Sequence, residues 1–140
     1  MNGETKIWLR YSKENFESAN VLLKNSLFNP CLQNVQQSVE KALKSLLIEK
    51  GERLKKTHDI LELKKKLEIL NIQVDTSDEH CDFLNSIYLP SKYPLGSVIP
   101  NFSPDEGICI EAITIAENVI KSVYSLLGFK PEINIPSEFE

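Results

Sequence analysis

The sequence predicts an all-α fold, arranged as an antiparallel up-and-down bundle of five helices. Apolar residues recur at intervals of three and four residues along most of the chain, which is the period of an amphipathic helix. The 140 residues include only five glycines and few Asn-Gly or Asp-Gly pairs, which disfavours a fold of many strands. The length suits a single domain. We therefore expect a helical bundle over residues 1–130.

The first two helices are expected at residues 5–24 and between 29 and 51. Asn29 is a predicted N-cap, Pro30 suits the first helical position, and Gly51 is a predicted stop. Glu40 and Lys44 have the spacing and order of a favourable ion pair within one helix. The inward-facing positions are Trp8, Ser12, Phe16, Ala19, Leu22 and Leu23 in the first helix, and Leu32, Val35, Val39, Ala42, Leu43, Leu46 and Leu47 in the second.

Three further helices are predicted. Thr57 or Asp59 is the expected cap of the third helix, which buries Ile60, Leu63, Leu67 and Leu70 and leaves residues 64–66 in solvent. The fourth begins near residues 76–79 and carries Cys81, Phe83, Leu84, Ile87 and Tyr88. Pro90, Pro94, Gly96 and Pro100 predict irregular structure through Asn101, in a segment long enough to be functional or interfacial.

The last helix is predicted to open with a capping box and to end at Gly128. In this box Ser103 is the cap, Pro104 takes the first helical position, and Glu106 returns to the cap. Residues 131–140 form an acidic tail that contains two prolines, and we expect it to be frayed or packed on a neighbour.

Charge is distributed unevenly along the chain. Residues 41–66 hold nine Lys or Arg against four acids, a balance of +5, whereas the whole chain carries −4, so the remainder carries −9. This basic stretch is interpreted either as an anion-binding surface or as a solvated helix end and loop.

Several features favour a cytoplasmic protein without a metal or cofactor. No apolar run approaches the ~20 residues of a membrane span, and no signal peptide is recognisable at the start. Cys31, Cys81 and Cys109 have no metal-binding spacing with each other or with His58 and His80, so reduced thiols are expected, at least two of them buried.

Several short motifs follow one another along the chain: Gln36-Gln37-Ser38-Val39-Glu40-Lys41-Ala42-Leu43-Lys44, then Thr57-His58-Asp59-Ile60, then Tyr88 and Lys92-Tyr93-Pro94. Together with Trp8 and Ala19, they resemble the HEPN domain family over about residues 5–128. In that family the second helix reads "QQAxEKALK", a "THDL" turn follows, and a tyrosine precedes "RYP". Trp8 and Ala19 match the usual start of the family.

The resemblance implies a five-helix bundle that forms homodimers. Stand-alone members are often partnered with a minimal nucleotidyltransferase in toxin–antitoxin-like modules. Many members are metal-independent endoribonucleases with an R-x(4–6)-H motif whose arginine and histidine meet across the dimer interface.

This chain contains one such string, from Arg53 to His58. It departs from the family because Leu54 replaces a polar residue, and because the string lies between the second and third helices instead of near the fourth. Histidine suits proton transfer from a 2′-hydroxyl, and a guanidinium suits a phosphate. The candidate catalytic residues are Arg53, His58 and Asp59. In the alternative interpretation, residues 57–59 form a helix cap and a backbone carbonyl satisfies the imidazole.

A second group of candidates would bind a nucleotide or a partner. Gln37, Lys41 and Lys44 are expected on one helical face, with Gln36 and Glu40 on the adjoining face, and together they either contact a ligand or form a network that fixes packing. Tyr88, Lys92 and Tyr93 either stack on a base or anchor the proline-rich segment.

Three functions remain open on the sequence. The chain is a HEPN subunit that binds a nucleotidyltransferase and a nucleotide, a ribonuclease toxin acting on RNA through Arg53 and His58, or a dimeric scaffold without a ligand. We expect the first.

Overall fold

The computed structural model describes residues 2–92 and 103–129, with side chains in the first range described as far as Tyr88. The described residues form five helices and no strand, which confirms the predicted all-α bundle. The helices are α1 (Gly3–Lys24), α2 (Phe28–Glu49), α3 (Ile60–Ile69), α4 (Asp78–Lys92) and α5 (Glu106–Leu126).

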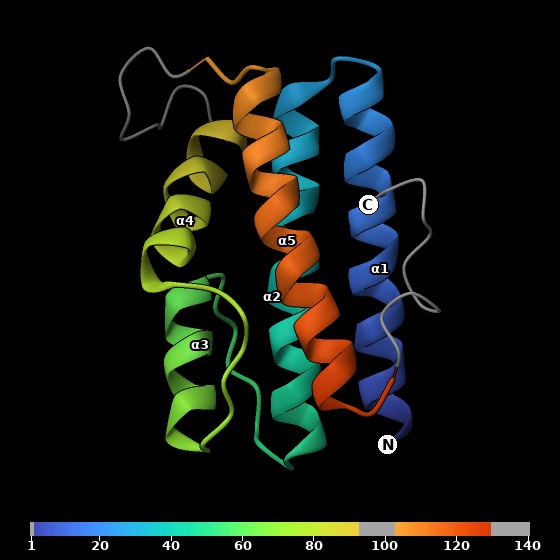
Figure 1. Cartoon of the computed structure of the whole chain (residues 1–140), viewed down its shortest axis with the longest axis vertical. Helices are drawn as coiled ribbons and strands as arrows, with labels where there is room; N and C mark the ends of the chain where they lie inside the picture. The colour runs from blue at the N-terminus through green and yellow to red at the C-terminus, as the bar shows by residue number, and fades with distance from the viewer. Residues whose placement is uncertain (1, 93–102, 130–140) are drawn as a thin grey trace.

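Helix α2 is the centre of the bundle. It packs against each of the other four helices, most extensively against the antiparallel α1. Figure 1 shows α3 and α4 one after the other, as a column beside the long helices. The connection over residues 50–59 returns along α2, since residue 58 contacts residues 36 and 40. This return places the segment before α3 against the middle of α2.

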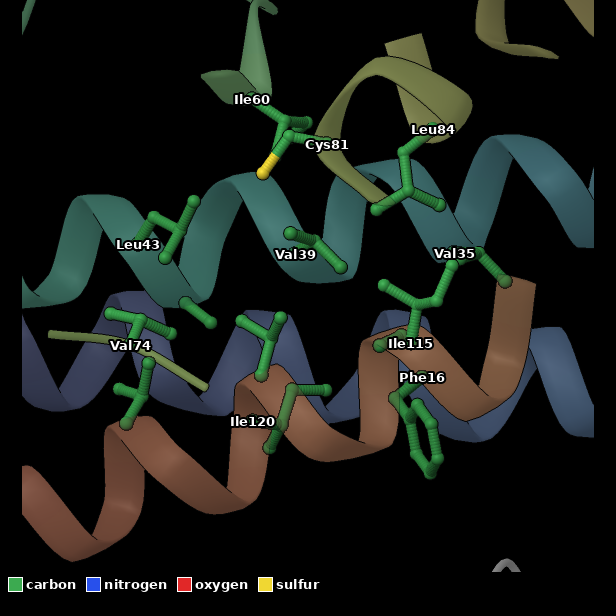
Figure 2. Packing of buried hydrophobic residues seen from close by; sticks show 14 of the residues in the cluster. Phe16, Val35, Val39, Leu43, Ile60, Val74, Cys81, Leu84, Ile115 and Ile120 are labelled. Atoms are coloured by element: carbon green, nitrogen blue, oxygen red, sulfur yellow. The ribbon is translucent and has the colours of Figure 1, made fainter. Parts of the chain in front are cut away.

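The core is continuous across all five helices. Figure 2 shows side chains of α1, α2 and α5 meeting, among them Phe16, Val39 and Ile120. Each fully buried side chain of this size contributes roughly 1.5–3 kcal/mol relative to its exposed state. All three cysteines are free and buried, as predicted, and burial raises the pKa of Cys31 to about 12. Within the described parts of the chain, no helix has the length and apolar character of a bilayer span.

The predicted N-cap residue is confirmed for one helix and is wrong for two others. Asp59 caps α3 by accepting the Glu62 N–H at 3.1 Å, as expected. Helix α2 begins earlier than predicted, at Phe28, so Asn29 and Pro30 lie inside its first turn, where N–H groups lack intrahelical partners and proline is tolerated. In α5 the cap is Asp105 instead of Ser103, with Asp105 Oδ1 accepting the Ile108 N–H at 2.9 Å.

Two other predictions were wrong. Helix α4 continues through Pro90 to Lys92, because a proline this close to a helix end removes only one of the last hydrogen bonds. Residues 93–102 of the predicted irregular segment lie outside the described residues. Lys64 is buried instead of solvated, because its Nζ donates to Asp78 Oδ1 at 2.7 Å and to Glu68 Oε2 at 3.1 Å, which ties α3 to the start of α4.

We predict that shortening Leu43 to alanine lowers the free energy of unfolding by about 2–5 kcal/mol, since the residue is fully buried on α2 and its loss leaves a cavity. Urea unfolding measures the change. Ile69→Ala is the control, because this side chain is 80% exposed, and its effect is expected within about 0.5 kcal/mol. Equal losses in the two variants would contradict the described core.

Candidate functional site

The candidate site is built around the carboxylate of Glu40, in the middle of α2. Its side chain is only 8% exposed. Glu40 Oε2 accepts from Lys44 Nζ at 2.7 Å, and Oε1 contacts His58 Nδ1 at 2.8 Å and Gln36 Nε2 at 3.3 Å. A carboxylate removed from water is stable only when charge and hydrogen bonds compensate it. The Lys44 ammonium supplies the charge, and the Glu40–Lys44 pair predicted from spacing is confirmed.

His58 is the exposed member of this cluster. Its side chain is 65% exposed although Nδ1 is held by Glu40. The backbone is fixed as well, because Gln36 Nε2 donates to the His58 carbonyl at 2.8 Å. The Tyr88 ring lies beside the imidazole, with centroids 5.6 Å apart. Helices α2 and α4 therefore hold the imidazole in one orientation.

This orientation determines which nitrogen of His58 is available. An ionised carboxylate only accepts hydrogen bonds, so Nδ1 carries a proton towards Glu40. In the neutral ring Nε2 then carries the lone pair and is left for a ligand or a proton. An exposed imidazole backed by a carboxylate is an arrangement that supports general acid–base chemistry or binding of a phosphate oxygen.

Asp59, proposed from the sequence as the acid beside His58, has a different position. Asp59 Oδ1 accepts from the Glu62 N–H and from Asn85 Nδ2 at 2.9 Å, so it caps α3 and joins it to α4. The acid that contacts the imidazole is Glu40, eighteen residues earlier. The cap in the alternative interpretation is present, but the imidazole is bound to a carboxylate instead of a carbonyl.

Arg53 is not brought to His58 within one chain. Its side chain lines a hollow together with Lys66 and Ile69 from the end of α3, whereas His58 precedes the start of that helix. A ten-residue helix is about 15 Å long. The two candidate catalytic residues therefore lie towards opposite ends of α3.

The other candidates on α2 divide differently from the expected faces. Lys44 joins Glu40 and Gln36 instead of Gln37 and Lys41. Lys41 turns to α1, where its Nζ donates to Asn15 Oδ1 at 2.7 Å, and burial lowers its pKa. Gln37 is half-buried. Positions 36, 40 and 44 form one row because residues four apart are neighbours on a helix.

Aromatic residues border the cluster on two sides. The Lys44 ammonium lies 5.7 Å from the centroid of the Trp8 ring of α1, within the range of a cation–π interaction. Tyr88, on α4, is buried. Lys92 is the last residue of α4 and its side chain is not described, and Tyr93 lies outside the described residues. The sequence predicted Trp8 as a core residue, and its contact with Lys44 was not predicted.

One buried polar atom beside the cluster has no protein partner in the described part of the chain. Gln36 donates through Nε2 to two groups, but its Oε1 accepts from none. An unsatisfied buried amide oxygen costs on the order of 1–3 kcal/mol. Across the same residues, no group of three His, Cys, Asp or Glu side chains could hold a metal ion.

A family model described as HEPN domain matches residues 5–126. The chain belongs to the HEPN domain family. The resemblance in the motifs is thereby confirmed. Among curated proteins, none matched.

Solved structures show the same HEPN fold. TT1696 from Thermus thermophilus is 24% identical with a TM-score of 0.71, covering 89% of this chain and 98% of its own. ST0689, described as an archaeal HEPN homologue, is 23% identical with a TM-score of 0.68 and coverages of 88% and 97%. An HEPN domain protein (tm0613) from Thermotoga maritima is 18% identical with a TM-score of 0.65 and coverages of 86% and 96%.

We predict strong energetic coupling between Glu40 and Lys44. Glu40→Gln leaves the buried ammonium without its carboxylate and is expected to cost about 3–5 kcal/mol of unfolding free energy. In the double variant with Lys44→Met much of this loss should disappear, so urea unfolding of the two single variants and the double variant should give a coupling of at least about 3 kcal/mol.

The matched control for this pair is Glu117 and Lys121 on α5. Their charges have the same order, the same spacing and the same 2.7 Å distance, but the side chains of Lys121 and Glu117 are 34% and 17% exposed. A helical pair that solvent reaches contributes about 0.3–0.5 kcal/mol. Equal coupling in both pairs would show that burial of Glu40 has no energetic role.

Proposed function

We propose that this protein is the HEPN subunit of a two-component, toxin–antitoxin-like module in the cytoplasm, and that it binds a minimal nucleotidyltransferase and a nucleotide. Membership of the HEPN family supports the partner, because stand-alone members are often paired in this way. The single observation that carries the proposal is the exposed His58 imidazole held by the buried Glu40. An exposed side chain that is held in one orientation is better suited to bind a ligand than the rest of the protein surface is.

The surroundings of His58 suit a nucleotide. The available imidazole nitrogen can hydrogen-bond a phosphate oxygen, and the Tyr88 ring beside it offers an aromatic edge to a base. These groups come from the segment before α3 and from α4, so a ligand here would contact two elements at once.

Binding is favoured over catalysis within one chain because, among the described residues, no unneutralised cation accompanies His58. The charge of Lys44 is matched by Glu40, and Arg53 lies towards the other end of α3. Phosphoryl transfer chemistry depends on a cation that stabilises the charge developing on phosphate. His58 by itself can bind a phosphate and exchange a proton, but it lacks this second group.

A metal-independent endoribonuclease is the second candidate, and the His58–Glu40 contact of 2.8 Å favours it. In such a reaction Nε2 removes the 2′-hydroxyl proton, the 2′-oxygen attacks phosphorus, and the 5′-oxygen departs with a proton. The missing cation would be Arg53 of a second copy. This candidate therefore requires the homodimer that the family resemblance implies.

We predict that adenosine triphosphate, added without a divalent metal, raises the melting temperature of the wild-type protein. Selective binding to the native state must stabilise it, by about 2.7 kcal/mol at a hundredfold excess over Kd. His58→Ala should abolish the shift. His80→Ala is the matched control, because His80 is also exposed but lies at the start of α4, and it should retain the shift. An equal shift in all three proteins would contradict binding at His58.

RNA cleavage by the purified protein in a metal chelator separates the two candidates. On the binding proposal, neither wild type nor His58→Ala cuts RNA. Cleavage by wild type and by His80→Ala, but not by His58→Ala, would instead establish the ribonuclease. The ribonuclease candidate requires a homodimer, which sedimentation tests. A species of 15.9 kDa at micromolar concentration is the monomer and would exclude a stable dimer.

The partner is tested by co-expression. We expect a short nucleotidyltransferase encoded beside this chain to elute with it as one complex. Separate elution of the two proteins at micromolar concentration would contradict this part of the proposal and leave nucleotide binding untouched.

A further inference from the structure

A second hollow of the molecule lies between the end of α2, the connection after it, and α3. Leu47 and Leu63 form its floor, Leu54 of the connection forms a wall, and Arg53, Lys55 and Lys66 stand around the opening. Its volume is about 200 Å³, comparable to one large apolar side chain. Ile69, at the edge, is 80% exposed and adds apolar surface there. We call this feature the basic hollow.

The charge around the basic hollow is poorly compensated. Among the described residues that line it, three carry positive charge and Glu52 alone carries negative charge. Arg53 and Lys55 form no ion pair with a described carboxylate, while Lys66 reaches Glu62 at 3.7 Å. An apolar floor beneath a cationic rim fits a segment that combines apolar side chains with carboxylates.

The chain itself contains such a segment. Residues 131–140 lie outside the described residues, but their sequence, Pro-Glu-Ile-Asn-Ile-Pro-Ser-Glu-Phe-Glu, holds three glutamates and neither lysine nor arginine. Ile133 and Ile135 are two positions apart, the spacing that places side chains on one face of an extended segment. We propose that residues 131–140 dock in the basic hollow of their own chain.

The position where the described chain ends makes this docking feasible. Leu126 and Leu127, at the end of α5, line a depression together with Leu46 and Lys50 of the α2 end. Leu46 is the neighbour of Leu47 in the floor of the basic hollow, so both features belong to the same end of the bundle, as Figure 1 shows for the ends of α2 and α5.

The length of the segment is also sufficient. Ile133 lies four residues beyond Phe129, a reach of at most ~14 Å, and a helix with its side chains is about 10–12 Å across. A tether this short gives an effective concentration in the millimolar range, so even a weak contact is occupied within one chain.

The test uses a fluorescent peptide of residues 130–140 and a chain that ends after Phe129. We expect the peptide to bind the shortened chain saturably, more weakly as salt increases, and at least tenfold more weakly to the full chain, whose own segment occupies the hollow. Lys55→Glu in the shortened chain should weaken binding at least fivefold. Lys56→Glu is the matched control: the same charge reversal in the adjacent exposed residue, which does not line the hollow.

Each other outcome overturns the proposal. If the peptide does not bind the shortened chain, or binds the full chain just as tightly, docking within the chain is excluded. Equal weakening by the two reversals shows general charge attraction without use of the hollow. If shortening converts a dimer to a monomer in sedimentation, the segment belongs in the hollow of a second copy. Circular dichroism of both variants confirms that the exposed substitutions leave the helices intact.

Discussion

The buried carboxylate of Glu40 is the interaction on which the arrangement of this HEPN domain depends. It lies on the helix that contacts all others, and it must be compensated because a bare charge in that position would be expensive. Lys44 compensates the charge, while His58 and Gln36 add hydrogen bonds. His58 lies in the connection after α2. Its hydrogen bond to Glu40 therefore also determines the path of this connection and where α3 begins.

The same constraint links structure to chemistry. A connection that returns along α2 brings an imidazole to the surface with one nitrogen already bound, and Asp59, the next residue, starts α3 as its cap. Asn85 of α4 fixes that cap from both sides, since its Nδ2 donates to Asp59 and its Oδ1 accepts the Ile60 N–H at 3.0 Å. The site is therefore stabilised by helix ends and a buried ion pair, and its most exposed part is the His58 side chain.

Charge separation is the second organising feature. Part of the positive charge of residues 41–66 is neutralised within the fold, since Lys44 forms a buried pair with Glu40 and the buried Lys64 pairs with the more exposed Asp78. Arg53 and Lys55 remain around an apolar hollow. The net charge of +5 in this stretch is thus divided between lysines that form ion pairs within the fold and a smaller set of cations around the hollow. Only this smaller set is available to an acidic ligand.

Local patterns predicted most of the fold. Apolar spacing located all five helices, and the order of charges predicted the Glu40–Lys44 pair, because both depend on neighbours within one helix. Caps were less predictable, since Asp105 and Ser103 are chemically equivalent candidates two residues apart. The contact of His58 with Glu40, the separation of Arg53 from it, and the burial of Lys64 were decided by tertiary structure alone. Each depends on how a connection or a neighbouring helix folds back, and no spacing along the chain encodes that path.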